Sequence, residues 1–401
     1  ADIVGVYDVY QQGIGLTARE SIQLPVNDPM LLVPAMASVT QHLGFGVTAN
    51  LSYEQPYLFA RRMSTLDHLT QGRAGWNIVT GYLDSAARAM GQTQQIPHDR
   101  RYDMADEYLD VLYQLWEGSW QEDALLADRQ NRIYADSTKI HSIQHHGEFF
   151  DVEGYHLTSP SPQRTPLLYQ AGSSKRGIQF AARHAECTFV NGATPQAMKA
   201  QVNTLRQAAV AAGRRADSLK VFMGVGVIVA KTEAEAKEKH HEYLRYASPE
   251  AGLAHFSSST GIDLASFDLD EPIVAGKVEA IESVTKAFSG WTKRRLLEQH
   301  ALGARYPVIV GSPSQVADAL QVWIDEADVD GFNLTRIVNP GSYRDFIDLV
   351  VPELQSRGVY KTEYAEGALR HKLFGQGAQL TALHPAAKRR YQPQPLQAFA
   401  G

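Results

Sequence analysis

The sequence predicts an α/β fold, and in particular a TIM-type (β/α)8 barrel with insertions. Short apolar segments rich in β-branched residues alternate with helical patterns at the spacing of βα units. We count about seven such strand segments, and 401 residues suffice for a barrel of this kind. One of the seven is a stub at residues 1–6, which reads as the end of a strand. We therefore expect the first βα unit of the barrel to be missing from this sequence.

The amino-acid composition indicates which classes of molecule this chain can bind. The net charge is −6 and the isoelectric point is near 6.2, so the chain has no long-range attraction for a polyanion. Nucleic acid and anionic membrane are excluded as first expectations, and a small-molecule partner is favoured. The single cysteine, Cys187, rules out an intrachain disulfide framework and lies at the edge of a predicted strand, so we interpret it as a structural thiol. There is no apolar run of about 18 residues and no signal peptide, which predicts a cytoplasmic protein.

The stretch at residues 72–82 is the centre of the predicted barrel. Its apolar run follows a glycine turn and reads as a buried parallel strand. We expect the carboxyl end of this strand to release Asn77, Thr80 and Tyr82 into a loop, where barrels bind their ligands. The alternative is that Asn77 and Thr80 only satisfy backbone groups where the strand ends.

The segments around this strand have clear local patterns. A helix over residues 29–42 begins with Asp28 as N-cap and Pro29 in the first turn. We further expect a strand at 43–50, a helix at 57–70, a polar loop holding His98 and Tyr102, and a helix at 103–117. Later units comprise a strand at 166–170 with a helix to 184, a strand at 187–191 with a helix at 195–212, a strand at 220–230 with a charged helix, a capped helix after Gly311, a strand at 329–334 and a helix at 341–357.

Residues 118–165 interrupt the alternation of strands and helices. They carry turn residues and the cluster His141, His145 and His146, and we predict an inserted hairpin or an excursion on the barrel surface there. The histidine spacings of four and one lack a cysteine or a Glu-x-x-His context, so we interpret them as a solvated loop and predict no metal site.

A possible anion site follows the predicted strand at 166–170. Its turn contains Ala171, Gly172, Ser173 and Ser174 and opens directly into a helix. Backbone N–H groups and two hydroxyls at a helix N-terminus favour an anion such as phosphate. The simpler interpretation is that one serine is only the N-cap of the helix.

The segment at about 248–275 is small, polar and irregular, a composition typical of a lid. His255 lies in it, either as a structural histidine or as a polar group directed at a substrate. We assign residues 1–375 to one barrel domain with insertions at about 118–165 and 248–305, and residues 376–401 to a C-terminal extension.

Several motifs, in order and along essentially the whole chain, resemble one family. They include the Tyr-Glu-Gln-Pro-Tyr sequence at 53–57, Ser-Thr-Leu-Asp-His-Leu-Thr-Gln-Gly-Arg at 64–73, Trp-Asn-Ile-Val-Thr at 76–80, His-Asp-Arg-Arg-Tyr at 98–102, Gln-Ala-Gly-Ser-Ser at 170–174 and Asp-Gly-Phe-Asn at 330–333. The chain resembles the flavin-dependent monooxygenases of the bacterial luciferase-like superfamily, in the branch with nitrilotriacetate, dibenzothiophene sulfone and long-chain alkane monooxygenases.

The resemblance implies a two-component monooxygenase that uses O2 and reduced FMN from a separate flavin reductase. Oxygen would add to flavin C4a, and the resulting hydroperoxide would oxygenate an alkane, an aminopolycarboxylate or an organosulfur compound. We also expect a homodimer or homotetramer. Carried over by position, the FMN-binding residues are Asp2, Thr48, Thr80, Gly81, His98, Tyr102, Ala171, Gly172, Ser173 and Ser174. Candidates for orienting substrate or peroxide are His255, Tyr82 and Tyr7.

The chain departs from the family pattern at two places. The family begins some fifty residues earlier, and Gly81 and Tyr82 stand where relatives commonly carry Ser and other residues, which implies a reshaped substrate pocket. Two other functions stay open: hydride transfer through flavin or deazaflavin, and flavin binding without catalysis. Five arginines are candidates for binding an acidic substrate, and the sequence does not rank them: Arg61, Arg62, Arg73, Arg100 and Arg101.

Overall fold

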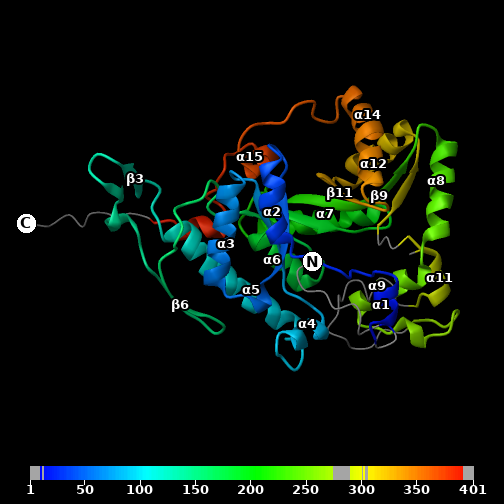
Figure 1. The fold of residues 1–401 in the computed structure, drawn as a ribbon, viewed down its shortest axis with the longest axis horizontal. Helices are drawn as coiled ribbons and strands as arrows, with labels where there is room; N and C mark the ends of the chain where they lie inside the picture. The colour runs from blue at the N-terminus through cyan, green and yellow to red at the C-terminus, as the bar shows by residue number, and fades with distance from the viewer. Residues whose placement is uncertain (1–9, 11–12, 274–289, 300, 303–305, 392–401) are drawn as a thin grey trace, which may run out of the picture. The chain divides into compact units, whose positions relative to one another are not determined.

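The computed structural model describes residues 10, 13–273, 290–299, 301–302 and 306–391 (Figure 1). The chain divides into two compact units. Unit 1 comprises residues 1–28, 81–100 and 169–364, and unit 2 comprises residues 29–80, 101–168 and 365–401.

Unit 2 contains two repeats in which a helix is followed by a strand. Helix α2 (Pro29–Ser38) leads to strand β1 (Phe45–Asn50), and helix α3 (Pro56–Leu69) leads to strand β2 (Ala74–Val79). The two strands pair in parallel, with Thr48 opposite Asn77. The outer face of β2 is fixed by Trp76, which is fully buried with its ring 4.6 Å from that of Phe59 on α3. These elements confirm the predicted order, although α2 ends four residues before the expected boundary.

Helix α5 (His98–Tyr113) continues into a π-helical segment at Gln114–Gly118. The expected loop at 98–102 is therefore wrong, because the helix already includes His98 and Tyr102. Asp99 in the first turn explains the early start, since a carboxylate there interacts favourably with the helix dipole.

Residues 118–165 form two antiparallel hairpins, where we predicted one hairpin or an excursion. The first pairs β3 (Leu125–Asp128) with β4 (Ile133–Ala135), and the second pairs β5 (Ile143–His146) with β6 (Asp151–Gly154). In the same unit, Arg370 of α15 (Leu369–Phe374) donates to the carbonyls of Thr165 (2.9 Å) and Pro166 (3.1 Å). Arg390 then pairs with the buried carboxylate of Glu117 at 2.7 Å, so residues near the C-terminus stabilise unit 2.

Unit 1 holds the remaining parallel strands. The end of β7 (Leu167–Gln170) pairs with β8 (Cys187–Val190), and β8 pairs with β9 (Lys220–Val229). Both β10 (Val308–Gly311) and β11 (Gly331–Thr335) pair in parallel with β9. The connecting helices are α6 (Lys175–His184), α7 (Pro195–Ala211), α8 (Glu233–Tyr246) and α12 (Pro313–Ala327), and β11 is followed by helical segments from Gly341 to Ser356.

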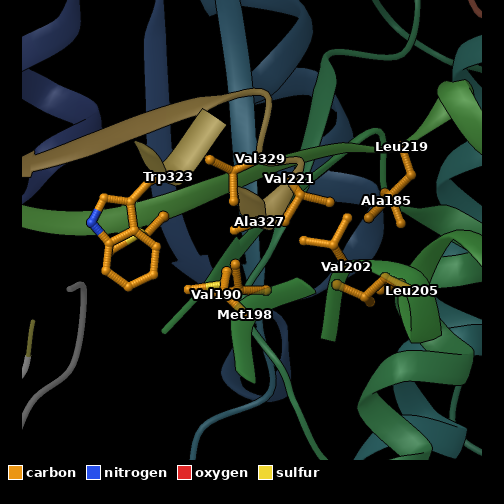
Figure 2. Close-up of a cluster of buried hydrophobic side chains, with 12 residues drawn as sticks. Ala185, Val190, Met198, Val202, Leu205, Leu219, Val221, Trp323, Ala327 and Val329 are labelled. Carbon is orange, nitrogen blue, oxygen red and sulfur yellow. The ribbon is translucent and has the colours of Figure 1, made fainter. Parts of the chain in front are cut away.

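A hydrophobic core joins these helices to the strands (Figure 2). The cluster includes Met198 and Val202 of α7, Val190 of β8, Val221 of β9 and Trp323 of α12. Cys187 is also fully buried, as expected of a structural thiol.

A second core in unit 1 joins segments that are far apart in the sequence. It combines α1 (Gly15–Arg19), α9 (Pro249–Thr260), the 3-10 turn at Leu264–Ser266 and α11 (Lys293–Gln299). In Figure 1, blue α1 lies beside yellow-green α9. We call this group the lid core. Our expectation of an irregular segment at 248–275 is wrong for α9, because Ser248 caps the helix, Pro249 starts it and Gly261 ends it in a left-handed conformation.

Candidate functional site

The turn between β7 and α6 brings two of the predicted cofactor residues together within unit 1. Ser174 is the N-cap of α6, and its hydroxyl accepts a hydrogen bond from the N–H of Gly177 at 3.0 Å. The same hydroxyl lies 3.3 Å from Nε2 of His98. His98 Nδ1 in turn lies 2.7 Å from the carboxylate of Asp99, which orients the ring. A ten-residue helix with a hydroxyl and an imidazole at its N-terminus is suited to a phosphate group.

The N-cap interpretation and the anion interpretation of Ser174 are therefore compatible. Its oxygen accepts from the helix backbone, while its O–H remains a donor to His98 or to an anion. Ala171, Gly172 and Ser173 form the connection that precedes this N-cap. Their roles toward FMN remain predictions.

Thr80, Gly81 and Tyr82 follow β2. The carbonyl of Thr80 accepts a hydrogen bond from the Ser52 hydroxyl at 2.7 Å within unit 2. Gly81 has a φ of +71°, in the left-handed region, so the family's serine at this position would be strained here. Tyr82 is half-buried before α4 (Asp84–Ala89), a short helix that the sequence analysis missed.

Asn77 lies inside β2 and not in the loop after it, which corrects our expectation. Its Nδ2 donates to the hydroxyl of Thr48 on β1 at 3.0 Å. The Asn77 Oδ1 atom is buried and has no hydrogen-bond partner among the residues that the structure describes. Buried amide oxygens are normally paired, so this atom can accept a donor from a bound molecule. Asn77 was absent from our predicted cofactor set, although its place in the predicted strand was a signal.

Tyr102 is buried on α5, one helical turn after His98. Two predicted residues, Asp2 and Tyr7, lie outside the described residues. Their roles stay predictions, as does that of Tyr102 toward the flavin.

His255 is half-buried on α9, at the lid core. Its Nε2 lies 2.9 Å from the amide nitrogen of Gln23, a residue that our sequence analysis did not single out. A separation of 232 residues leaves no local signal for this contact. Nearby, the Tyr10 hydroxyl contacts Glu250 of α9 at 3.3 Å, and burial together with this carboxylate raises the pKa of Tyr10 to about 12.

Each of the clustered histidines His141, His145 and His146 has a structural contact. His145 lies 3.1 Å from the Glu107 carboxylate, which also accepts three backbone N–H groups from residues 148–150, and these hydrogen bonds lower the pKa of Glu107 despite its burial. His146 pairs with Asp151 at 2.7 Å, and His141 stacks on Tyr391. His145 is thus largely buried, contrary to our expectation of a solvated loop. Within the described ranges, no three histidine, cysteine or acidic side chains form a metal-binding group.

The five candidate arginines differ in their contacts and in their exposure. Arg73 donates to the carbonyls of Thr70 at 2.8 Å, Leu43 at 3.1 Å and Ala37 at 3.3 Å, so it is a structural residue. Arg62 forms an ion pair with Glu54. Arg101 is fully buried on α5, whereas Arg61 and Arg100 are exposed.

Parallel strands with connecting helices define an α/β protein, and the turn from β7 into α6 is suited to a phosphorylated ligand. The luciferase-like monooxygenase family matches residues 11–330, and the chain belongs to this family. Dimethyl-sulfide monooxygenase of Hyphomicrobium sulfonivorans is 48% identical over 397 residues, which cover 97% of this chain and 83% of that protein.

Long-chain alkane monooxygenase of Geobacillus thermodenitrificans is 49% identical over 378 residues, covering 94% of this chain and 83% of the relative. A crystal structure of long-chain alkane monooxygenase has a TM-score of 0.90 and covers 97% of this chain and 87% of its own. A riboflavin lyase crystallised with modified FMN and riboflavin also has a TM-score of 0.90, with 43% identity, covering 94% of this chain and 85% of that one.

These similarities confirm the TIM-type barrel, the superfamily branch and the flavin-dependent monooxygenase class. Reduced FMN is the cofactor and O2 the cosubstrate. No helix in the described part of the chain is long and apolar enough to cross a bilayer.

Proposed function

We propose that this protein is the oxygenase component of a two-component system that oxygenates a small uncharged substrate, either a dialkyl sulfide or an alkane. A separate reductase supplies reduced FMN, and the oxygenase acts in the cytoplasm as a homodimer or homotetramer. The observation that supports the proposal is the Ser174–His98 pair at the N-terminus of α6, a position suited to the phosphate of FMN.

FMN fits this site because its phosphate is a dianion near neutral pH. Ser174 would donate its O–H to a phosphate oxygen. His98, with both ring nitrogens protonated, would add a second donor from Nε2, because its Nδ1–H faces the Asp99 carboxylate. The N–H groups in the first turn of α6 add a favourable dipole. The flavin ring supplies the oxygen-activating chemistry when FMN is bound.

Two observations favour an uncharged substrate over an aminopolycarboxylate. Arg73 and Arg62 are committed to backbone carbonyls and to Glu54, so neither is available to a substrate carboxylate. In addition, the two relatives at 48% and 49% identity are named for dimethyl sulfide and for long-chain alkanes, which are both uncharged.

The chain's own residues have three tasks in this proposal. Ser174 and His98 hold the phosphate. Asn77 offers its buried Oδ1 to a donor on a bound molecule. His255, with Tyr82 and Tyr7, orients the substrate or the reacting oxygen.

The activity is tested with 18O2, a flavin reductase and FMN, with dimethyl sulfide, hexadecane and nitrilotriacetate as separate substrates. We expect 18O in the product of one uncharged substrate and none from nitrilotriacetate. Oxygenation of nitrilotriacetate alone would contradict the substrate class. If no substrate is oxygenated and bound reduced FMN oxidises as fast as free FMN in stopped flow, the monooxygenase proposal itself fails.

The phosphate site is tested by Ser174→Ala, with Ser312→Ala as a matched control. Ser312 is the N-cap of α12 in the same unit, so both changes remove one capping hydroxyl. We expect only Ser174→Ala to weaken FMN binding, by about tenfold or more, because a hydrogen bond to a charged group is lost. Riboflavin lacks the phosphate, so its affinity should not change. Equal losses for FMN and riboflavin would contradict the assignment.

The similarity to riboflavin lyase raises a second candidate, in which a second flavin is the substrate. Riboflavin and FMN supplied together under turnover conditions test it, with mass spectrometry of the flavin products. Consumption of riboflavin without oxygenation of the sulfide or alkane would favour this candidate.

A further inference from the structure

The contact between Gln23 and His255 joins two parts of unit 1. Gln23 follows α1, and His255 lies in the middle of α9, with 2.9 Å between the amide nitrogen and Nε2 of the ring. We propose that Gln23 is a positioning residue, which holds the His255 ring with its proton on Nδ1. This inference rests on the proposed role of His255 toward substrate or oxygen.

The backbone around Gln23 is strained in a way that fixes its direction. Ser21 and Gln23 have φ values of +54° and +51°, in the left-handed region, which is unfavourable for a residue with a side chain. Between them, Ile22 is buried in the lid core, and the Ser21 hydroxyl donates to the carbonyl of Leu24 at 2.9 Å. The burial of Ile22 and this hydrogen bond stabilise the strained turn. Gln23 itself is exposed, so its own burial does not explain the strain.

The chemistry of the two side chains sets the position of the proton. An amide nitrogen only donates hydrogen bonds, so the Nε2 atom of His255 must accept. A neutral imidazole that accepts at Nε2 carries its proton on Nδ1. The Nδ1 atom of His255 is then an N–H donor, the kind of group that stabilises an oxygen on which negative charge develops.

A purely structural role would be a staple between the turn and α9. The structure contains such a staple nearby, since the Tyr10 hydroxyl contacts Glu250 of the same helix at 3.3 Å. Tyr10→Phe removes that contact without touching the ring of His255. It is therefore the matched control for a change at Gln23.

The test uses the protein labelled with 15N-histidine, free of FMN, and long-range 1H–15N correlation spectra that report which ring nitrogen is protonated. The signal of His255 is assigned by its loss in His255→Gln. We expect Nδ1–H in the unmodified protein and in Tyr10→Phe. In Gln23→Glu the carboxylate can only accept, so we expect a proton on Nε2. Gln23→Met should give a mixture of the two tautomers.

Turnover provides the second measurement. We expect Gln23→Met to lower kcat about tenfold with little change in KM, because a positioning contact is lost while the substrate site is retained. The fraction of consumed oxygen that is released as peroxide should rise. Tyr10→Phe should change neither value.

A proton on Nε2 in the unmodified protein would overturn the proposal, as would an unchanged tautomer in both Gln23→Glu and Gln23→Met. The spectra do not depend on turnover. If the protein oxygenates no substrate but the tautomer follows residue 23, the proposed function fails and the positioning role of Gln23 stands. If the tautomer follows Gln23 while kcat does not, the role of His255 in the reaction is refuted.

Discussion

His156 gives unit 2 a stability that depends on pH. The residue follows the β5–β6 hairpin and is 5% exposed. Its Nε2 lies 2.7 Å from the hydroxyl of Thr158 and 3.0 Å from that of Ser64 on α3. Burial, with a smaller contribution from the charge of His68, lowers its pKa from 6.5 to about 4.

The sign and size of the effect follow from these two pKa values. Between pH 6.5 and pH 4 the unfolded chain binds a proton at this position and the folded chain does not, so stability falls as the pH falls through this window. Each pKa unit corresponds to about 1.4 kcal/mol, so the loss between pH 8 and pH 5 is about 2 kcal/mol. The full loss, about 3 kcal/mol, is reached below pH 4.

We expect His156→Gln to remove this part of the pH dependence. The Gln side chain retains an amide that can contact the two hydroxyls but takes up no proton near neutral pH. Urea unfolding followed by tryptophan fluorescence at pH 8 and pH 5 measures the difference. His146→Gln is the control, because that side chain is 71% exposed and should leave the pH dependence nearly unchanged.

If His156→Gln lost as much stability between pH 8 and pH 5 as the unmodified protein does, His156 would not be the source of the pH dependence. An equal reduction of the pH dependence in His146→Gln would also contradict this role of His156.

Two further substitutions test the packing within each unit. In Gly147→Ala, the new Cβ would lie 1.9 Å from a carboxylate oxygen of Glu107, so the carboxylate must leave its three backbone donors. We expect a loss of about 2–4 kcal/mol, seen as a lower Tm, and an unchanged Tm would contradict the contact. In unit 1, Met198→Ala should cost about 2–5 kcal/mol because Met198 is fully buried, whereas the exposed neighbouring change Lys199→Ala should cost less than about 0.5 kcal/mol. Similar losses for these two variants would contradict the placement of the core.

The elements that the sequence predicted well are those whose signal is local. The glycine turn and apolar run of β2, the Pro-initiated helix α3 and the Ser174 N-cap each lie within a dozen residues, and each is present in the structure. Local signals also existed for α9, since Ser248 and Pro249 precede it and Gly261 follows it. The small, polar composition of the segment favours a loop over a helix, so it conceals these cap signals.

Contacts between distant segments could not be predicted in this way. The Glu107 carboxylate binds backbone N–H groups more than forty residues away, and the partner of His255 lies 232 residues earlier. Composition gives no sign of either contact, because Gln and Glu residues are common in any sequence. The histidine cluster illustrates the same limit, since its burial depends on α5 and on Tyr391 rather than on its own neighbours.

The lid core explains why residue 23 can influence residue 255. Ile22 and Leu16 on one segment share buried contacts with Leu253 and Phe256 on α9, so burial of apolar surface places the two segments together. This packing orders the strained turn, and only then does the Gln23 amide reach the ring of His255. A substitution that weakens the packing of the lid core, such as one at Ile22, would therefore change the contact between Gln23 and His255. It would do so although the side chain of Ile22 is apolar.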